Sequence, residues 1–189
     1  MLEELVHYDK ELFLFLNNLG NTSWDGFWLF VTNKWSSVPI YVVLAFLCYK
    51  DFGIKKTVLL IVTIALLITA TDQLANLFKY GVQRLRPCYD NDVHLLMRLV
   101  KDSCGGRFGY FSAHASNSFA IAFFFTYLLK YKFKYIGFLL FVWAFAVAYS
   151  RIYIGVHFPL DVISGAVIGL IFSSLFVKMF IFVSRKIGV

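Results

Sequence analysis

The chain has 189 residues, of which 60% are hydrophobic and 20% are aromatic, and its mean hydropathy is +0.72. This composition excludes a soluble globular domain, which needs more polar surface to cover its core. The formal net charge of +7 contains no long basic run with interleaved aromatic residues, so nucleic acid is not an expected partner. We expect a single membrane-embedded domain over residues 1–189.

Residues 1–35 are expected to form an interfacial N-terminal segment, of which residues 2–16 are too polar to span a bilayer. Residues 2–16 have apolar side chains at helical spacing, with Glu3, Glu4, Asp9, Lys10 and Glu11 among them. This pattern predicts an amphipathic helix on the outer membrane surface, with a frayed tail as the alternative. The acidic start lacks the basic region of a signal peptide, so a cleaved leader is not expected.

Five apolar runs follow, and a spanning helix needs about 20 residues at about 1.5 Å per residue. The runs cover residues 36–49, 57–79, 113–129, 135–152 and 160–182. The first is short, and residues 24–35 lengthen it if they enter the membrane. The expected fold is an all-α polytopic bundle of five transmembrane helices with an N-terminal interfacial helix.

Basic residues in three connectors predict the orientation. If the spans alternate, one side of the membrane receives Lys50, Lys55, Lys56, Lys130, Lys132, Lys134, Arg185 and Lys186. Short basic connectors stay in the cytoplasm, so the N-terminus and the loop of residues 80–112 are expected outside. In a bacterial cytoplasmic membrane this loop faces the periplasm or the cell exterior.

The outer loop contains Cys88 and Cys104, whereas Cys48 lies in an apolar run and no Cys pair has zinc-ligand spacing. An oxidising compartment permits a bridge between the first two, and closing this loop contributes about 3 kcal/mol in the chain-entropy model. Residues 93–100 are amphipathic and are expected to rest on the lipid surface. The loop also carries Arg84, Arg98, Lys101 and Arg107, for which contact with a pyrophosphate or with lipid headgroups stays open.

Polar groups inside apolar spans are costly, and here they gather at the outer helix ends. Three stretches contribute Lys79 and Arg86; Ser112, Ala113 and His114; and Arg151, His157 and Asp161. Guanidinium and ammonium groups bind phosphate oxygens, and free backbone N–H groups at a helix start also bind anions. The three stretches therefore predict a phosphate site.

The two histidines differ in context. Asp161 follows His157 by four residues, so its carboxylate can orient the ring and leave the other nitrogen as a nucleophile. His114 has no nearby acid and suits a general acid. Asp72 and Asn76 lie on the helix face of Lys79, and either order that lysine or satisfy each other and the neighbouring backbone.

These stretches resemble the motifs of the type 2 phosphatidic acid phosphatase superfamily, which also contains the vanadium haloperoxidases. The superfamily pattern K-x6-R-P matches Lys79, Arg86 and Pro87, and P-S-G-H matches Ser112 and His114. The pattern S-R-x5-H-x3-D matches Ser150, Arg151, His157 and Asp161. The resemblance covers about residues 71–165 and implies an acid phosphatase/vanadium haloperoxidase-like core. Phe111 and Ala113 depart from it, because they stand where the family has Pro and Gly.

The resemblance implies a metal-independent reaction without a cofactor. His157 attacks phosphorus and forms a phosphohistidine, Asp161 supports His157, and His114 protonates the leaving group. The phosphoryl oxygens are held by Lys79, Arg86, Arg151, Ser112 and nearby backbone N–H groups such as that of Ala113.

The implied substrate is the phosphomonoester or pyrophosphate of a membrane lipid. Undecaprenyl pyrophosphate, phosphatidylglycerol phosphate, phosphatidic acid and lipid A phosphate all stay open. A lipid-phosphate binding or transport protein without turnover is the alternative, although binding alone does not need the His157–Asp161 pair. Haloperoxidase chemistry is disfavoured because those relatives are soluble, and no obligate protein partner is expected.

Overall fold

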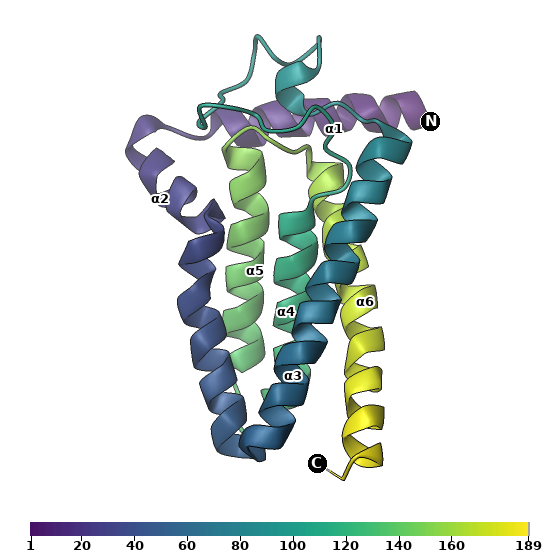
Figure 1. Cartoon of the computed structure of the whole chain (residues 1–189). Helices are drawn as coiled ribbons and strands as arrows, with labels where there is room; N and C mark the ends of the chain where they lie inside the picture. The colour runs from purple at the N-terminus through teal and green to yellow at the C-terminus, as the bar shows by residue number, and fades with distance from the viewer. Residues whose placement is uncertain (189) are drawn as a thin grey trace.

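The computed structural model describes residues 1–188 and confirms an all-α chain; this part contains no β-strand. Its elements are α1 (Leu2–Asn18), α2 (Thr22–Thr32), the short 3-10 helix η1 (Lys34–Ser37), α3 (Val38–Val82), the 3-10 helix η2 (Pro87–Tyr89), α4 (Ala113–Leu129), α5 (Ile136–Tyr153) and α6 (Pro159–Lys186). Figure 1 shows α3 to α6 as an upright bundle with α1 lying across one end.

Helix α3 reverses direction at Gly53, so it forms two arms that diverge from a tight turn (Figure 1). Gly53 has φ +77° and ψ 175°, a conformation that is open to glycine and closed to most other residues. The spans expected at residues 36–49 and 57–79 correspond to the two arms. Within residues 1–188, three stretches are long and apolar enough to cross a membrane: Lys34–Val82, Ile136–Tyr153 and Pro159–Lys186.

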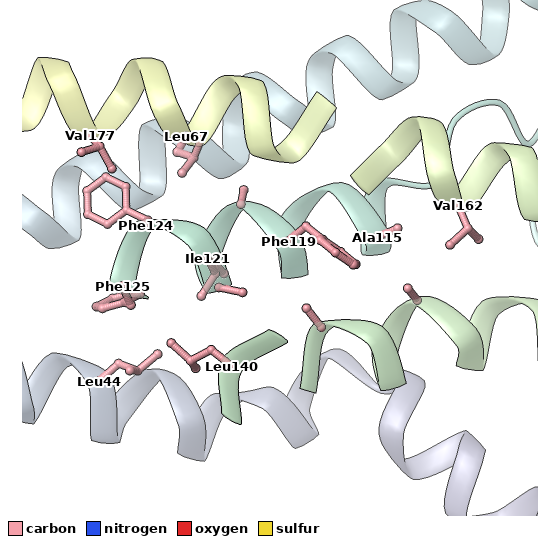
Figure 2. Packing of buried hydrophobic residues seen from close by; sticks show 14 of the residues in the cluster. Leu44, Leu67, Ala115, Phe119, Ile121, Phe124, Phe125, Leu140, Val162 and Val177 are labelled. Carbon is pink, nitrogen blue, oxygen red and sulfur yellow. The ribbon is translucent and has the colours of Figure 1, made fainter. Parts of the chain in front are cut away.

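Helix α4 is the centre of the bundle, although its 17 residues make it shorter than its neighbours. Most of its side chains are buried, on every side of the helix. Figure 2 shows Phe119, Ile121 and Phe124 of α4 between the side chains of α3, α5 and α6. A helix that is apolar all round lies inside a bundle, so α4 is the central helix and the others pack around it.

Helices α4 and α6 approach each other closely because small residues line their contact. A Cβ atom at Gly165 would lie 2.4 Å from the Ser112 carbonyl oxygen, and one at Gly169 would lie 2.2 Å from that of Ser116. One turn further on, the Ser173 hydroxyl donates to the Ala120 carbonyl at 2.8 Å. Such stripes of small residues let helix backbones touch inside a membrane. The contact brings together the N-terminal ends of α4 and α6.

The N-terminal residues form an ordered helix, so the frayed-tail alternative is wrong. Helix α1 buries Asp9, Phe13 and Asn17 against the end of the bundle. The Asn17 amide donates to the carbonyls of Arg98, Ile152 and Tyr153 at 2.9–3.1 Å. The exposed apolar side chains of α1 and of the residue that ends it follow a helical repeat: Leu5, Tyr8, Leu12, Phe15 and the C-cap residue Leu19. This stripe agrees with the amphipathic pattern in the sequence.

The predicted disulfide between Cys88 and Cys104 is confirmed, with Cα atoms 6.3 Å apart. It cross-links the long loop between α3 and α4, at the end of the bundle where α1 lies. The turn between the arms of α3 and the C-terminus lie at the opposite end (Figure 1). There Lys132, from the connector between α4 and α5, forms an ion pair with Asp51. The basic connectors and the disulfide loop are therefore at opposite ends.

Candidate active site

A cavity of about 520 Å³ lies between the two arms of α3, α4, α5 and the residues around η1. Its lining includes six residues from all three predicted stretches: Lys79, Arg86, Ala113, His114, Arg151 and His157. Lys79 and His157 are far apart in the sequence, so only the folding of the chain brings their side chains to the same cavity. The structure thus brings three cations and two imidazoles to one cavity.

Two of the arginines are held by groups that leave guanidinium edges for a ligand. Arg86 donates from Nε to the Phe108 carbonyl at 3.2 Å and from Nη1 to the Cys104 carbonyl at 2.8 Å. The disulfide-linked loop thereby orients Arg86. Arg151 is buried and donates to the Thr32 hydroxyl, whereas its buried Nε has no hydrogen-bond partner within residues 1–188. A buried, unpaired N–H of a cation suits an anion with several acceptor oxygens.

His157 and Asp161 form the pair that their spacing predicts. Nδ1 of His157 lies 3.4 Å from Oδ2 of Asp161, and that oxygen also accepts the Phe158 N–H at 3.0 Å. Both side chains are buried, with exposed fractions of 3% and 0%. Because Nδ1 faces the carboxylate, Nε2 is the nitrogen available to a ligand in the cavity.

Burial lowers the pKa of His157 from 6.5 to about 4, and the hydrogen bond to Asp161 opposes only part of this shift. The imidazole is therefore neutral near pH 7, as a nucleophile must be. The unfolded chain takes up this proton below about pH 6.5 and the folded chain does not, so stability falls as the pH decreases from 6.5 towards 4.

This shift predicts a specific pH dependence. We expect the acid limb of kcat/KM to appear well below pH 6.5, because only there does His157 become protonated in the free enzyme. The substrate phosphate itself titrates near about pH 6, so its own pKa is measured separately by phosphorus NMR. An acid limb at or above pH 6.5 after this correction contradicts a neutral, desolvated His157.

Sequence reasoning missed the role of Arg84, which it placed in the loop as a contact for pyrophosphate or headgroups. Arg84 instead forms ion pairs with Asp161 through Nη1, at 2.7 Å, and with Asp9 through Nη2. Asp9 also accepts the Leu160 N–H at 2.8 Å. A network therefore runs from α1 through Arg84 to the acid beside His157. No signal in the sequence points to this network, because an acid on an amphipathic helix usually faces water.

Gly109 is a second residue that the motifs did not single out. A Cβ atom at this position would lie 3.0 Å from Cγ of Arg86, 3.3 Å from Oδ2 of Asp161 and 3.6 Å from Nδ1 of His157. The loop backbone therefore packs directly against the histidine–carboxylate pair. A side chain at position 109 would crowd Arg86 and this histidine–carboxylate pair.

Ser112 is placed differently from the expectation that its hydroxyl faces the phosphate. Its side chain is fully buried, caps α4 by accepting the Ala115 N–H at 3.4 Å, and is not among the residues that line the cavity. Its backbone N–H donates to the Asp161 carbonyl at 2.9 Å. Capping and tying α4 to α6 therefore occupy this residue, whereas its neighbours Ala113 and His114 line the cavity.

Asp72 and Asn76 also line the cavity, beside Lys79. Asp72 accepts a hydrogen bond from the Asn117 amide at 2.9 Å, and the Thr71 hydroxyl lies 2.6 Å from Oδ1 of Asn117. Asp72 and Asn76 are not bonded to each other. Asp72 is therefore held by α4, a partner that neither alternative in the sequence named.

Comparison with known proteins bears on the whole site. The model of the PAP2 superfamily matches residues 56–185. A lipid A 4'-phosphatase of Bacteroides thetaiotaomicron is 37% identical over 171 residues, which cover 89% of this chain and 75% of the relative. A lipid A 4'-phosphatase of Porphyromonas gingivalis is 30% identical, over 99% of this chain and 79% of the relative.

A solved structure agrees with these matches. The crystal structure of Aquifex aeolicus LpxE has a TM-score of 0.65 and 30% identity, and the match covers 89% of this chain and 93% of that one. The match to the family model includes the cations, both histidines and Asp161. With its motifs, fold and relatives in agreement, the chain belongs to the PAP2 superfamily.

Proposed function

We propose that this protein removes phosphate from a membrane lipid through a phosphohistidine, without a metal ion, at the outer face of a bacterial cytoplasmic membrane. One observation carries the proposal: a single cavity collects His114, His157 and three cations from separate stretches of the chain. The relatives are named phosphatases, which supports turnover. A binding or transport protein would need the cations but not the His157–Asp161 pair.

In the first step, Nε2 of His157 attacks phosphorus while the bond to the leaving ester oxygen breaks. His114 gives its proton to that oxygen, and Asp161 stabilises the developing charge on the His157 ring through Nδ1. Lys79, Arg86 and Arg151 compensate the negative charge on the phosphoryl oxygens.

In the second step, water attacks the phosphohistidine and the N–P bond breaks. His114, now neutral, accepts a proton from this water, and inorganic phosphate leaves. The backbone N–H of Ala113 at the start of α4 is a further donor to the phosphoryl oxygens. We also keep the Ser112 hydroxyl as a proposed donor, because capping uses its oxygen as an acceptor and leaves its proton free.

Among lipid phosphates, lipid A phosphate is the substrate that we propose first, because two relatives are named for its 4'-phosphate. Undecaprenyl pyrophosphate, phosphatidylglycerol phosphate and phosphatidic acid are the competing substrates. The cavity is lined mainly by α3, α4 and α5, which we propose to span the membrane, so the substrate would stay in the membrane during the reaction.

We further propose five membrane-spanning helices in one domain over residues 1–189: the two arms of α3, then α4, α5 and α6. The basic connectors at one end support its placement in the cytoplasm. The disulfide at the other end supports an oxidising compartment for the cavity. Residues 1–35 and the loop of residues 80–112 then lie at the periplasmic or exterior surface.

The test is phosphate release by purified protein in detergent with EDTA present. We expect release from lipid A phosphate at a rate that EDTA does not change, and slower release from the competing lipids at equal surface density. Activity that disappears with EDTA and returns with Mg²⁺ contradicts the metal-independent mechanism. Absence of release from every lipid contradicts the phosphatase proposal itself.

A further inference from the structure

The cavity is much larger than a phosphate group requires. Its volume of about 520 Å³ corresponds to about 17 water molecules at about 30 Å³ each, whereas a phosphate has five heavy atoms. Along α3 the lining extends from Lys79 to Ile68, roughly 16 Å at about 1.5 Å per residue. The cavity therefore extends deeper into the bundle than the cations.

The wall next to the cations is polar. Asp72, Asn76, Asn117 and Ser118 line it, at the depth of membrane-spanning helices. Asn117 fixes Asp72 by donating to its Oδ1 at 2.9 Å. Polar groups at this depth are costly, so four of them along one wall of a cavity indicate a ligand with hydrogen-bonding groups.

The far end of the cavity is aromatic and then apolar. Trp143 and Tyr41 line it as an edge-to-face pair with ring centroids 6.1 Å apart. Tyr41 and Ile68 also line an apolar pocket of about 250 Å³ between the two arms of α3. The other residues of this pocket are Val42, Ala45, Leu60, Ile61, Ile64, Ile121 and Phe125. The lining thus changes from cationic, to polar, to apolar along one path.

We propose that Asp72, Asn76 and Asn117 form a subsite for the hydroxyl-bearing sugar ring of a phosphorylated glycolipid, directly beside the bound phosphate. This proposal rests on the proposed function and deepens it. A carboxylate accepts hydrogen bonds from sugar hydroxyls, amides both donate and accept them, and Trp143 offers an apolar face to the ring. The apolar pocket then receives a hydrocarbon chain of the same lipid.

The same groups act against the competing substrates. A polyprenyl diphosphate would place either its second phosphate or an isoprene chain beside Asp72. The phosphate is repelled by the carboxylate, and the isoprene chain offers no hydrogen bond to Asp72 or Asn76 in exchange for the water that it displaces. Sites built to hydrogen-bond a substrate hydroxyl reject analogues that lack it. The subsite therefore selects a sugar phosphate lipid over a polyprenyl diphosphate.

The experiment compares kcat/KM for lipid A phosphate, phosphatidic acid and undecaprenyl diphosphate in two variants, Asp72→Asn and Asn76→Leu. We expect a loss of about 10- to 100-fold for lipid A phosphate, as for a lost hydrogen bond to a charged or buried group, and less than about threefold for the others. The matched control is Gln73→Leu, because Gln73 is exposed on α3 and does not line the cavity. This control should leave all three rates unchanged.

A binding measurement separates the two proposals. Glucosamine 4-phosphate should protect the wild-type protein from thermal unfolding at lower concentration than inorganic phosphate, and both variants should abolish this difference. Equal losses on all three lipids, or an unchanged advantage of the sugar phosphate in the variants, would overturn the subsite. If the wild type hydrolyses none of the lipids, the proposed function fails, and the protection data still decide the subsite.

Discussion

Replacement of His157 by Ala is expected to lower kcat/KM for lipid phosphate hydrolysis by at least about 10⁴-fold, because the covalent route loses its nucleophile. The histidine is buried beside Asp161, and its neutral form presents Nε2 to the cavity. Rapid quenching of the wild type in alkaline detergent with phosphorus-labelled substrate should yield a phosphoprotein that is stable in base and labile in acid. The His157→Ala protein should yield none.

His114→Ala provides the matched comparison. Its loss should depend on the leaving group: roughly 10²- to 10⁴-fold with a lipid alcohol, and much less with p-nitrophenyl phosphate, whose leaving group needs no proton. The His157 variant should lose activity equally on both substrates. Thermal unfolding of the purified variants checks that each is folded. Phosphoprotein formed by the His157→Ala protein, or equal losses on both substrates at His114, contradicts the assigned roles.

Replacement of Arg84 by Met is expected to destabilise the folded protein by about 3–5 kcal/mol, because it leaves two buried carboxylates without their shared cation. Arg84 pairs with both Asp9 and Asp161, whose side chains are 1% and 0% exposed. The variant should also lose activity, since Asp161 orients His157. The measurement is thermal unfolding in detergent, together with kcat/KM.

A double-mutant cycle tests whether the network is the cause. Asp9→Asn combined with Arg84→Met should be less destabilised than the sum of the two single changes, because the double variant leaves one buried carboxylate rather than two. Arg107→Met is the matched control, since this arginine is exposed in the same loop. Strict additivity, or an equal loss of stability in the control, contradicts coupling through Arg84.

The arrangement of helices and cations could be predicted because their signals are local. Runs of apolar residues mark the helices, and motif spacing marks the cations and histidines. The Arg84 network could not be predicted, because Asp9 lies 75 residues away and an acid on an amphipathic helix usually faces water. The capping role of Ser112 could not be predicted, because a serine before a helix serves equally as a cap and as an anion donor, and sequence does not say which.

The sequence predicts a connector between the apolar runs of residues 36–49 and 57–79, but not the form of the reversal at Gly53. The connector between the two apolar runs, residues 50–56, is basic and polar enough for a short loop, yet the helix resumes after a single residue. The positive φ of Gly53 distinguishes a one-residue turn from a longer loop, and the sequence does not specify that angle.

The backbone contact of α4 with α6 at Gly165 and Gly169 has a mechanical consequence for an enzyme in a bilayer of changing thickness. His114, the general acid that we propose, lies in the first turn of α4, and His157, the proposed nucleophile, directly precedes the first residues of α6. Because the two backbones touch, we expect α4 and α6 to tilt together when the lipid thickness changes, which would preserve the distance between the two histidines.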